Sequence, residues 1–303
     1  MLAAVATLAA AFPNGGRAAV VFEESAGGAV SDSRELTTLA ELSAVPGGLY
    51  LVAVAARGVR DVESVTGMGL AWTRVSAQCS GRGQTSVEVW RGTGQPTGGP
   101  VAASLDAVAV SAVITAMRFS GADPWATVGS MLSANSNGPA GACGGGTDGA
   151  AIAMPLAAVD AGAGAFALVA MRMSFPTTGG GASVLDARWW GTGADVTGLG
   201  VIGRTATSSG PMTLQVALDR PTDWAAIALE IQPLGTTPPP VLRVTPDQHD
   251  FGTVLVTQSG DAAFAVENVG ARDLAVFSIA LVGLHAAEFS FVTSPGPCTI
   301  LPG

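Results

Sequence analysis

The stretch that decides the fold is LYLVAVA, Leu49–Ala55. Turn residues bound it at Pro46–Gly48 and Arg57-Gly58, and two runs of similar kind follow at Val65–Val75 and Ser86–Trp90. Apolar runs that are short, bounded by turn residues and rich in β-branched and aromatic side chains are typical of strands rather than helices. The segment from Leu49 to Trp90 therefore predicts three strands.

The composition extends this prediction to the whole chain. Of the 303 residues, 48% are hydrophobic, only 12% are charged, and 41 are Gly. All 14 basic residues are Arg. Few charges, frequent Gly and many short apolar runs favour an all-β protein with numerous turns.

The net charge restricts the class of partner. The net charge is −9, and the sequence contains no cluster of basic residues. Contacts with nucleic-acid phosphates require concentrated Arg or Lys, as does attraction to an anionic membrane surface. After the first segment, no apolar run reaches the roughly 18 residues that a membrane-spanning helix needs. We therefore expect no nucleic-acid partner and no membrane insertion, and the weakly charged acidic surface suits a secreted protein.

Residues 1–17 allow three interpretations. Met1–Phe12 is apolar and Ala-rich, like the hydrophobic part of a signal peptide, and Ala9–Ala11 suits a small-residue cleavage site. The positive region that normally precedes such a segment is missing, because the first basic residue is Arg17. A degenerate signal or disordered segment, a start inside a longer protein, and a first strand are all open.

Further strands are predicted across residues 18–233. Val108–Phe119 alternates with apolar side chains on both faces, which is typical of a central strand covered on both sides. The other predicted strands are 18–23, 36–45, 150–156, 165–171, 184–190, 196–202, 212–218 and 224–231. Since no βαβ rhythm is present, we expect a jelly-roll-like two-sheet β-sandwich, in which each sheet gains a dry face.

Residues 234–240, LGTTPPP, interrupt the strand pattern. A Pro triplet resists both helix and sheet pairing, so we interpret this segment as a linker between two domains, 18–233 and 241–303. The second domain has five predicted strands, at 241–244, 251–256, 262–266, 274–282 and 289–292. They predict a partial immunoglobulin-like β-sandwich, because the segment is shorter than the roughly one hundred residues of a whole one.

A series of short motifs follows the linker in a fixed order. They are Leu242–Pro246, Asp250–Val254, Asn268–Gly270, Leu274–Val276, Ile279–Gly283, Ala287–Phe289, Cys298 and Leu301–Gly303. The series resembles the Hydin-like (ASH) immunoglobulin domains of bacterial choice-of-anchor D surface and secreted proteins. The resemblance implies core positions for Phe251 and Phe289 and a turn at Asn268. It also implies that the last strands are missing after Gly303, which leaves Cys298 without its partner.

The first domain is similar to a β-sandwich module of the same class of multi-module bacterial exoproteins. The residues that carry this similarity are Leu49–Ala55, Arg60–Val62, Val65–Val75, Cys79, Val87–Trp90, Phe119–Asp123 and Trp224–Ile231. The similarity covers nearly the whole of 18–233. It implies no catalytic set.

Two cysteines of the first domain, Cys79 and Cys143, lie in Gly-rich loops. In an exoprotein such a pair predicts a disulfide, here one that closes a loop of about sixty residues. Two free buried thiols are the alternative. A zinc site is not expected, because this domain has neither a CxxC motif nor a His.

Adjacent tryptophans, Trp189 and Trp190, are the first candidates for ligand contact. Neighbouring strand residues point to opposite faces, so we expect one ring in the core and the other facing solvent or a neighbouring strand. An exposed Trp on a β-sandwich can stack on a sugar ring, and Trp125, in a loop after Asp123-Pro124, is a further candidate. The alternative is that the rings are packed under loops, since Trp is mostly buried on average.

Catalytic and metal sites have weaker support. Glu88 and Glu230 could form the carboxylate pair of a glycosidase, but carboxylates that alternate with apolar residues usually face solvent. His249 and His285 are the two His residues, and no Gly-x-Ser-x-Gly motif accompanies them. The turns at 135–138 and 147–149 offer oxygen ligands for Ca²⁺, although ordinary turn chemistry explains them too.

These observations predict a non-enzymatic extracellular or cell-surface module for adhesion or structural display, with a glycan or a surface protein as partner. A carbohydrate-binding accessory module of a larger secreted enzyme is the alternative, and a glycosidase-type enzyme comes third. We expect no cofactor and no metal, and the oligomeric state is not predicted.

Overall fold

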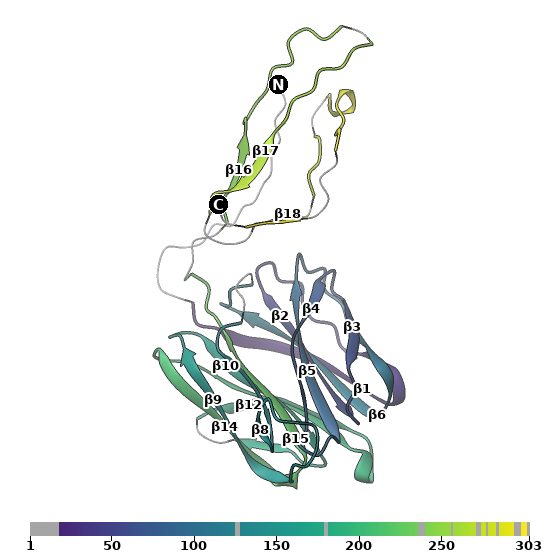
Figure 1. Ribbon diagram of the computed structural model, residues 1–303, viewed down its shortest axis with the longest axis vertical. Helices are drawn as coiled ribbons and strands as arrows, with labels where there is room; N and C mark the ends of the chain where they lie inside the picture. The colour runs from purple at the N-terminus through teal and green to yellow at the C-terminus, as the bar shows by residue number, and fades with distance from the viewer. Residues whose placement is uncertain are drawn as a thin grey trace. The chain divides into compact units, whose positions relative to one another are not determined.

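The computed structural model describes residues 18–124, 128–178, 181–235, 240–255, 257–270, 274–276, 278–282, 285–293 and 298–301. Contacts divide the chain into a first unit that ends at Leu234 and a second unit that contains the residues from Gly235 onward. The prediction of an all-β fold is confirmed, because the described residues form antiparallel sheets and no α-helix (Figure 1). Two single-turn 3₁₀ helices are present, η1 (Gly193–Asp195) and η2 (Ala286–Glu288).

The first sheet of the first unit contains the stretch that decided the fold. Its strand order is β1 (Val21–Thr37), β6 (Val101–Ser120), β2 (Leu49–Arg57), β5 (Thr85–Thr93) and β4 (Ala71–Cys79). A sixth strand, β3 (Val62–Gly67), also pairs with β6, whose 20 residues accommodate three partner strands. β2 lies at the centre of this order and is buried throughout except at Arg57.

The second and third sheets follow in sequence. The second has the order β12 (Ser183–Trp190), β13 (Thr197–Thr205), β10 (Gly164–Arg172), β15 (Trp224–Ile231), β7 (Met131–Asn135) and β8 (Gly138–Pro139). The third has the order β11 (Pro176–Thr178), β14 (Gly210–Thr222) and β9 (Gly149–Val159). The prediction of a β-sandwich is confirmed, and the structure adds a third layer to the two sheets expected.

Three apolar cores explain these layers. One joins β2, β5 and β6 to β10, β13 and β15, and therefore fills the space between the first and second sheets. Another joins the opposite faces of β10 and β15 to β9 and β14. A further core lies on the outer face of the first sheet, under β3 and the folded-over parts of β1 and β6.

Small side chains on the second sheet allow the third layer to approach. The face of β10 and β15 toward that layer carries Ala165, Ala167, Ala226 and Ala228, which leave room for larger residues of β9 and β14 such as Met154 and Leu214. Because the second sheet is covered on both faces, β10 and β15 are apolar without alternation.

One long strand replaces two that the sequence predicted. Residues 18–23 and 36–45 were expected as separate strands, but β1 runs without interruption through the Gly/Ser/Asp segment between them. It pairs with β6 from Val21 to Thr37, so tertiary pairing overrides the local preference for a turn. The expected second strand does not continue beyond this point, and Leu39 is 91% exposed.

The second unit contains two strand pairs. β16 (Leu242–Thr245) pairs with β17 (Ala265–Asn268), and β18 (Leu274–Val276) pairs with β19 (Cys298–Ile300). The buried Asn268 accepts a hydrogen bond from the Gly270 amide at 3.1 Å, as its expected role in a turn requires, and donates to the Ile300 carbonyl at 3.0 Å.

Two further strands were predicted in the second unit, at 251–256 and 289–292. The described residues there, 251–255 and 289–292, form no strand, so this prediction is wrong. The rings of Phe251 and Phe289 nevertheless contact each other at 5.8 Å, although Phe289 is not buried as expected of a core residue.

Candidate functional site

The candidate site begins at the end of β12, an edge strand of the second sheet. β12 pairs with β13 on one side only, and its last two residues are Trp189 and Trp190. Their exposed fractions are 54% and 49%. The expectation that one of the two rings lies in the core is wrong, as is the alternative that both are packed under loops. Both faces of β12 therefore reach solvent at the end of this edge strand.

Trp189 is held in place by an aromatic neighbour. Its ring packs edge-to-face on Phe175 with the centroids 4.7 Å apart. Two glycines of β13 make room for the segment that carries Phe175: a Cβ at Gly198 would lie 3.3 Å from the Ser174 carbonyl oxygen, and one at Gly200 would lie 2.9 Å from Pro176. We call Phe175, Trp189 and Trp190 the aromatic edge.

Trp190 faces the first sheet and is partly committed to structure. Its indole N–H donates to the Ser31 hydroxyl of β1 at 3.0 Å. Two residues earlier on the same strand, Arg188 lies against the backbone of Gly27, where a Cβ would come within 2.5 Å of the guanidinium. The two side chains close the gap between the edges of the first and second sheets, so Trp189 is the better platform for a ligand. Trp125 lies outside the described residues.

A pocket of about 190 Å³ opens at the end of β10. It is lined by Gln84, Asp148, Arg172, Met173 and the segment Arg220–Asp223, and we call it the Arg172 pocket. Met173 of this lining lies two residues before Phe175 of the aromatic edge in the sequence. Arg172 is also in register with Thr197, and Thr197 with Trp190, so these three residues form one row across β10, β13 and β12.

Arg172 links three parts of the pocket wall. Its Nε donates to the Ala194 carbonyl of η1 at 3.1 Å, and its Nη1 donates to the Gln84 side-chain oxygen. Arg57 lies on the other side of Gln84 and donates to its backbone carbonyl at 3.0 Å. Burial lowers the pKa of Arg57 and the positive charge of Arg172 lowers it further, whereas the charges of Asp195 and Asp223 oppose the shift. Two guanidinium groups therefore lie close to each other at this wall, with carboxylates near them.

The carboxylates of the pocket already have partners. Asp223 is buried and accepts from the Ser80 hydroxyl at 2.6 Å and from the amides of Arg82 and Gln84 at 2.9 and 3.1 Å. Both oxygens of Asp148 accept from the Arg82 guanidinium at 2.9 Å. These bonds hold the β4–β5 turn, which supplies Gln84.

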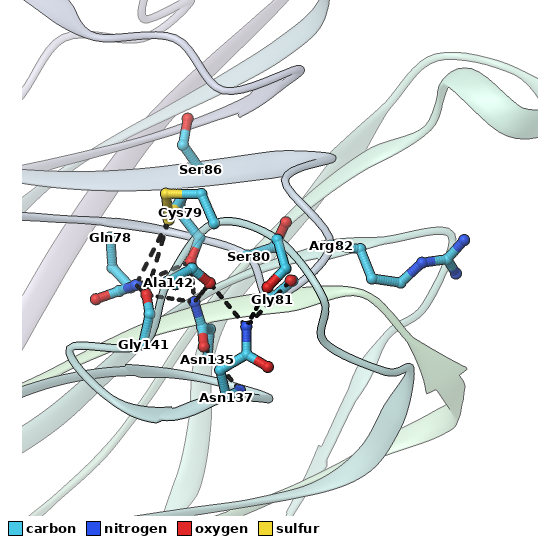
Figure 2. Close-up of a disulfide and its surroundings, with 12 residues drawn as sticks. Gln78, Cys79, Ser80, Gly81, Arg82, Ser86, Asn135, Asn137, Gly141 and Ala142 are labelled. Atoms are coloured by element: carbon cyan, nitrogen blue, oxygen red, sulfur yellow. Dashed lines mark hydrogen bonds between the residues drawn. A yellow bond between two sulfur atoms is a disulfide. The ribbon is translucent and has the colours of Figure 1, made fainter.

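The predicted disulfide between Cys79 and Cys143 is confirmed. It joins the end of β4 to the loop after β8, and Figure 2 shows three amide side chains converging on the carbonyl groups around it. Gln78 and Asn135 both donate to the Gly141 carbonyl at 2.9 Å, and Asn137 donates to the Ala142 carbonyl at 2.8 Å. The loop is thus held by polar contacts as well as by the covalent bond.

The two carboxylates considered for a glycosidase do not form a pair. Glu88 and Glu230 are both buried, contrary to the expectation that they face solvent. Glu88 lies opposite Val54, on the outer face of the first sheet, whereas Glu230 alternates with Leu229 and Ile231 and so faces away from the core between the two sheets. An entire sandwich layer separates them.

Each of these carboxylates fixes local structure. Glu88 accepts from the Val62 amide at 2.9 Å and from the Trp90 indole at 3.0 Å. Burial raises the pKa of Glu88, and the two hydrogen bonds oppose that shift. Glu230 accepts from the amides of Ser130 and Asp160 at 2.9 and 2.8 Å and so anchors two loops.

The histidines and the calcium candidates have structural partners. His249 packs edge-to-face on Phe251 at 4.7 Å, and His285 lies 2.9 Å from Glu288. The amides of Asn135 and Asn137 are occupied around the disulfide, as described above. Within the described ranges, no three His, Cys, Asp or Glu side chains gather to hold a metal ion, and no helix is long and apolar enough to cross a membrane.

Comparisons with known proteins add no relative: no family model, no curated protein and no solved structure matches this chain. The site therefore has to be interpreted from its geometry. Sequence reasoning identified Trp189 and Trp190 but missed Phe175, Gln84, Arg172 and Arg220. These residues are far apart along the chain, and Arg172, Arg220 and Gln84 come together only because the ends of β10 and β14 meet the β4–β5 turn.

Proposed function

We propose that the first unit is a non-enzymatic glycan-recognition module of an extracellular or cell-surface protein. The observation that carries this proposal is the exposed ring of Trp189, held in place by Phe175. Ligand sites combine aromatic surface with a few convergent polar groups, and an indole face offers a flat apolar surface to the C–H groups of a sugar ring.

The disulfide supports the extracellular placement. Disulfides persist in oxidising compartments and are rare in the reducing cytosol, and Cys79–Cys143 closes a loop of the same unit. For the second unit we propose an immunoglobulin-like spacer of the ASH type, on the motifs given above. In this proposal the first unit recognises the ligand and the second displays it, which amounts to adhesion.

The test is a glycan-array measurement on the full chain, with Trp189→Ala and Trp189→Phe as variants. Selective binding should fall roughly five- to hundredfold in the Ala variant, taking the stacking of a sugar ring as comparable to that of a nucleic-acid base, roughly 1–3 kcal/mol. The Phe variant should recover part of the loss, because it keeps a flat ring. The matched control is Leu39→Ala, which removes a highly exposed apolar side chain outside the aromatic edge.

The outcome separates recognition from a purely structural role. A folded chain that binds no glycan would refute the proposal and leave a spacer as the better account. Binding that is equal in the wild type and in Trp189→Ala would keep the function but remove the aromatic edge as its site.

A further inference from the structure

The Arg172 pocket has hydrogen-bond donors that lack a partner among the described residues. Among the described residues, no partner accepts from Nη2 of Arg172 or from the side-chain amide nitrogen of Gln84. The Arg220 side chain is 59% exposed, and its contact with Asp219 is long, at 3.5 Å. All three groups are hydrogen-bond donors, and the two Arg residues are always charged.

The carboxylate groups near the pocket, in contrast, already accept hydrogen bonds. Asp223 receives three hydrogen bonds, and both oxygens of Asp148 are bound to Arg82. Asp219 also receives bonds, from the Ser174 hydroxyl at 2.6 Å and the Phe175 amide at 3.0 Å. A ligand that enters the pocket therefore meets donors with free hydrogens, whereas each nearby carboxylate is already paired with an Arg or with hydroxyl and amide groups, which favours a ligand that accepts hydrogen bonds.

The shape of the donors favours a planar anion. Guanidinium groups match a carboxylate through two parallel hydrogen bonds, and charge-assisted bonds of this kind are about twice as strong as neutral ones. Met173 lines the pocket and lies two residues before Phe175 of the aromatic edge. Arg172 and Trp190 are two strands apart in one row, which is roughly 10 Å between backbones, and Trp189 points to the opposite face at the same end of the sheet. One oligosaccharide would have to pass around this end of the sheet to contact both Arg172 and Trp189.

We propose that the Arg172 pocket is a subsite for the carboxylate of an acidic sugar, a uronic acid, of a glycan that also stacks on Trp189. This inference rests on the proposed glycan recognition and adds the class of glycan. The net charge of −9 gives no long-range attraction to a polyanion, so selectivity has to come from the direct contacts of Arg172, Arg220 and Gln84.

The test compares two ligands that differ only in charge: a uronic-acid oligosaccharide and the neutral oligosaccharide made from it by carboxyl reduction. Calorimetry on the full chain should give at least about tenfold tighter binding of the acidic form. Arg220→Gln should lose about tenfold for the acidic form and little for the neutral form, because hydrogen bonds to a charged group carry the difference. Arg220 is exposed, so this variant should fold.

Two further variants complete the design. Arg34→Gln removes an exposed Arg that pairs with Glu63 and lines no part of the pocket, so its affinities should equal those of the wild type. Trp189→Ala should weaken both ligands alike. Equal binding of the two ligands by the wild type, or an Arg220→Gln variant that keeps its preference, would overturn the acidic subsite and leave glycan recognition standing. Absence of binding to both ligands and to the glycan array would overturn both proposals.

Discussion

Removing the Cys79–Cys143 disulfide should destabilise the first unit by about 4 kcal/mol. The bridge spans a sequence separation of 64 residues. In the chain-entropy model a loop of this size costs the unfolded chain roughly 14 cal/mol/K, which is ~4 kcal/mol at 25 °C. The perturbation is the double variant Cys79→Ala/Cys143→Ala, which leaves no unpaired thiol at the site. For a unit of this size the melting temperature should fall by roughly 10 °C.

Urea unfolding followed by tryptophan fluorescence measures this loss in the full chain. All six Trp residues lie between positions 72 and 224, so the signal reports on the first unit only. Cys298→Ala is the matched control, because Cys298 is free and exposed in the second unit, and this variant should change nothing. A loss below about 1 kcal/mol in the double variant would refute the reasoning. It would mean that the unfolded chain stays compact here, so that the bridge restricts it little.

Two other predictions concern buried positions. Burial raises the pKa of Glu88 above the 4.5 of the unfolded chain, so its contribution to stability is greatest below pH ~4.5 and decreases as the pH rises through the folded pKa. Urea unfolding across pH 4–7 should show this decrease in the wild type and not in Glu88→Gln. Parallel curves of stability against pH for the two proteins would contradict the prediction. Gly198→Ala places a Cβ 2.9 Å from Met171 and 3.3 Å from the Ser174 carbonyl. The substitution should lower the free energy of unfolding by about 1–3 kcal/mol. It should also displace Phe175 from Trp189 and so change the tryptophan fluorescence spectrum. Gly144→Ala, whose Cβ meets nothing within 4 Å, is its control, and equal stability of the two would contradict the packing argument.

Strand positions could largely be predicted from the sequence, because bounded apolar runs are a local signal. Leu49–Ala55, Ala165–Met171 and Trp224–Ile231 all correspond to observed strands. The third layer could not be predicted in this way. Strands β9 and β14 alternate like members of an ordinary sandwich, and the partner they cover is determined by the small residues on β10 and β15.

The candidate site was predicted only in part, for a related reason. A Trp pair is visible in any sequence, but its exposure depends on whether the strand lies at an edge, which is a property of sheet order. Arg172 and Arg220 have no local feature that distinguishes them from the other Arg residues of the chain. Their role depends on the ends of β10 and β14 reaching the same end of the sandwich as the β4–β5 turn.

The two long edges of the sandwich are closed by bonds of different strength. On the β4 and β7 side the Cys79–Cys143 bridge joins the layers covalently, whereas on the β1 and β12 side the Trp190–Ser31 hydrogen bond and the Arg188 contact join them. Local opening should therefore resemble a hinge with its axis at the disulfide, and amide hydrogen exchange should be fastest along β12. A ligand bound at the aromatic edge would therefore stabilise the side of the sandwich that we expect to open first.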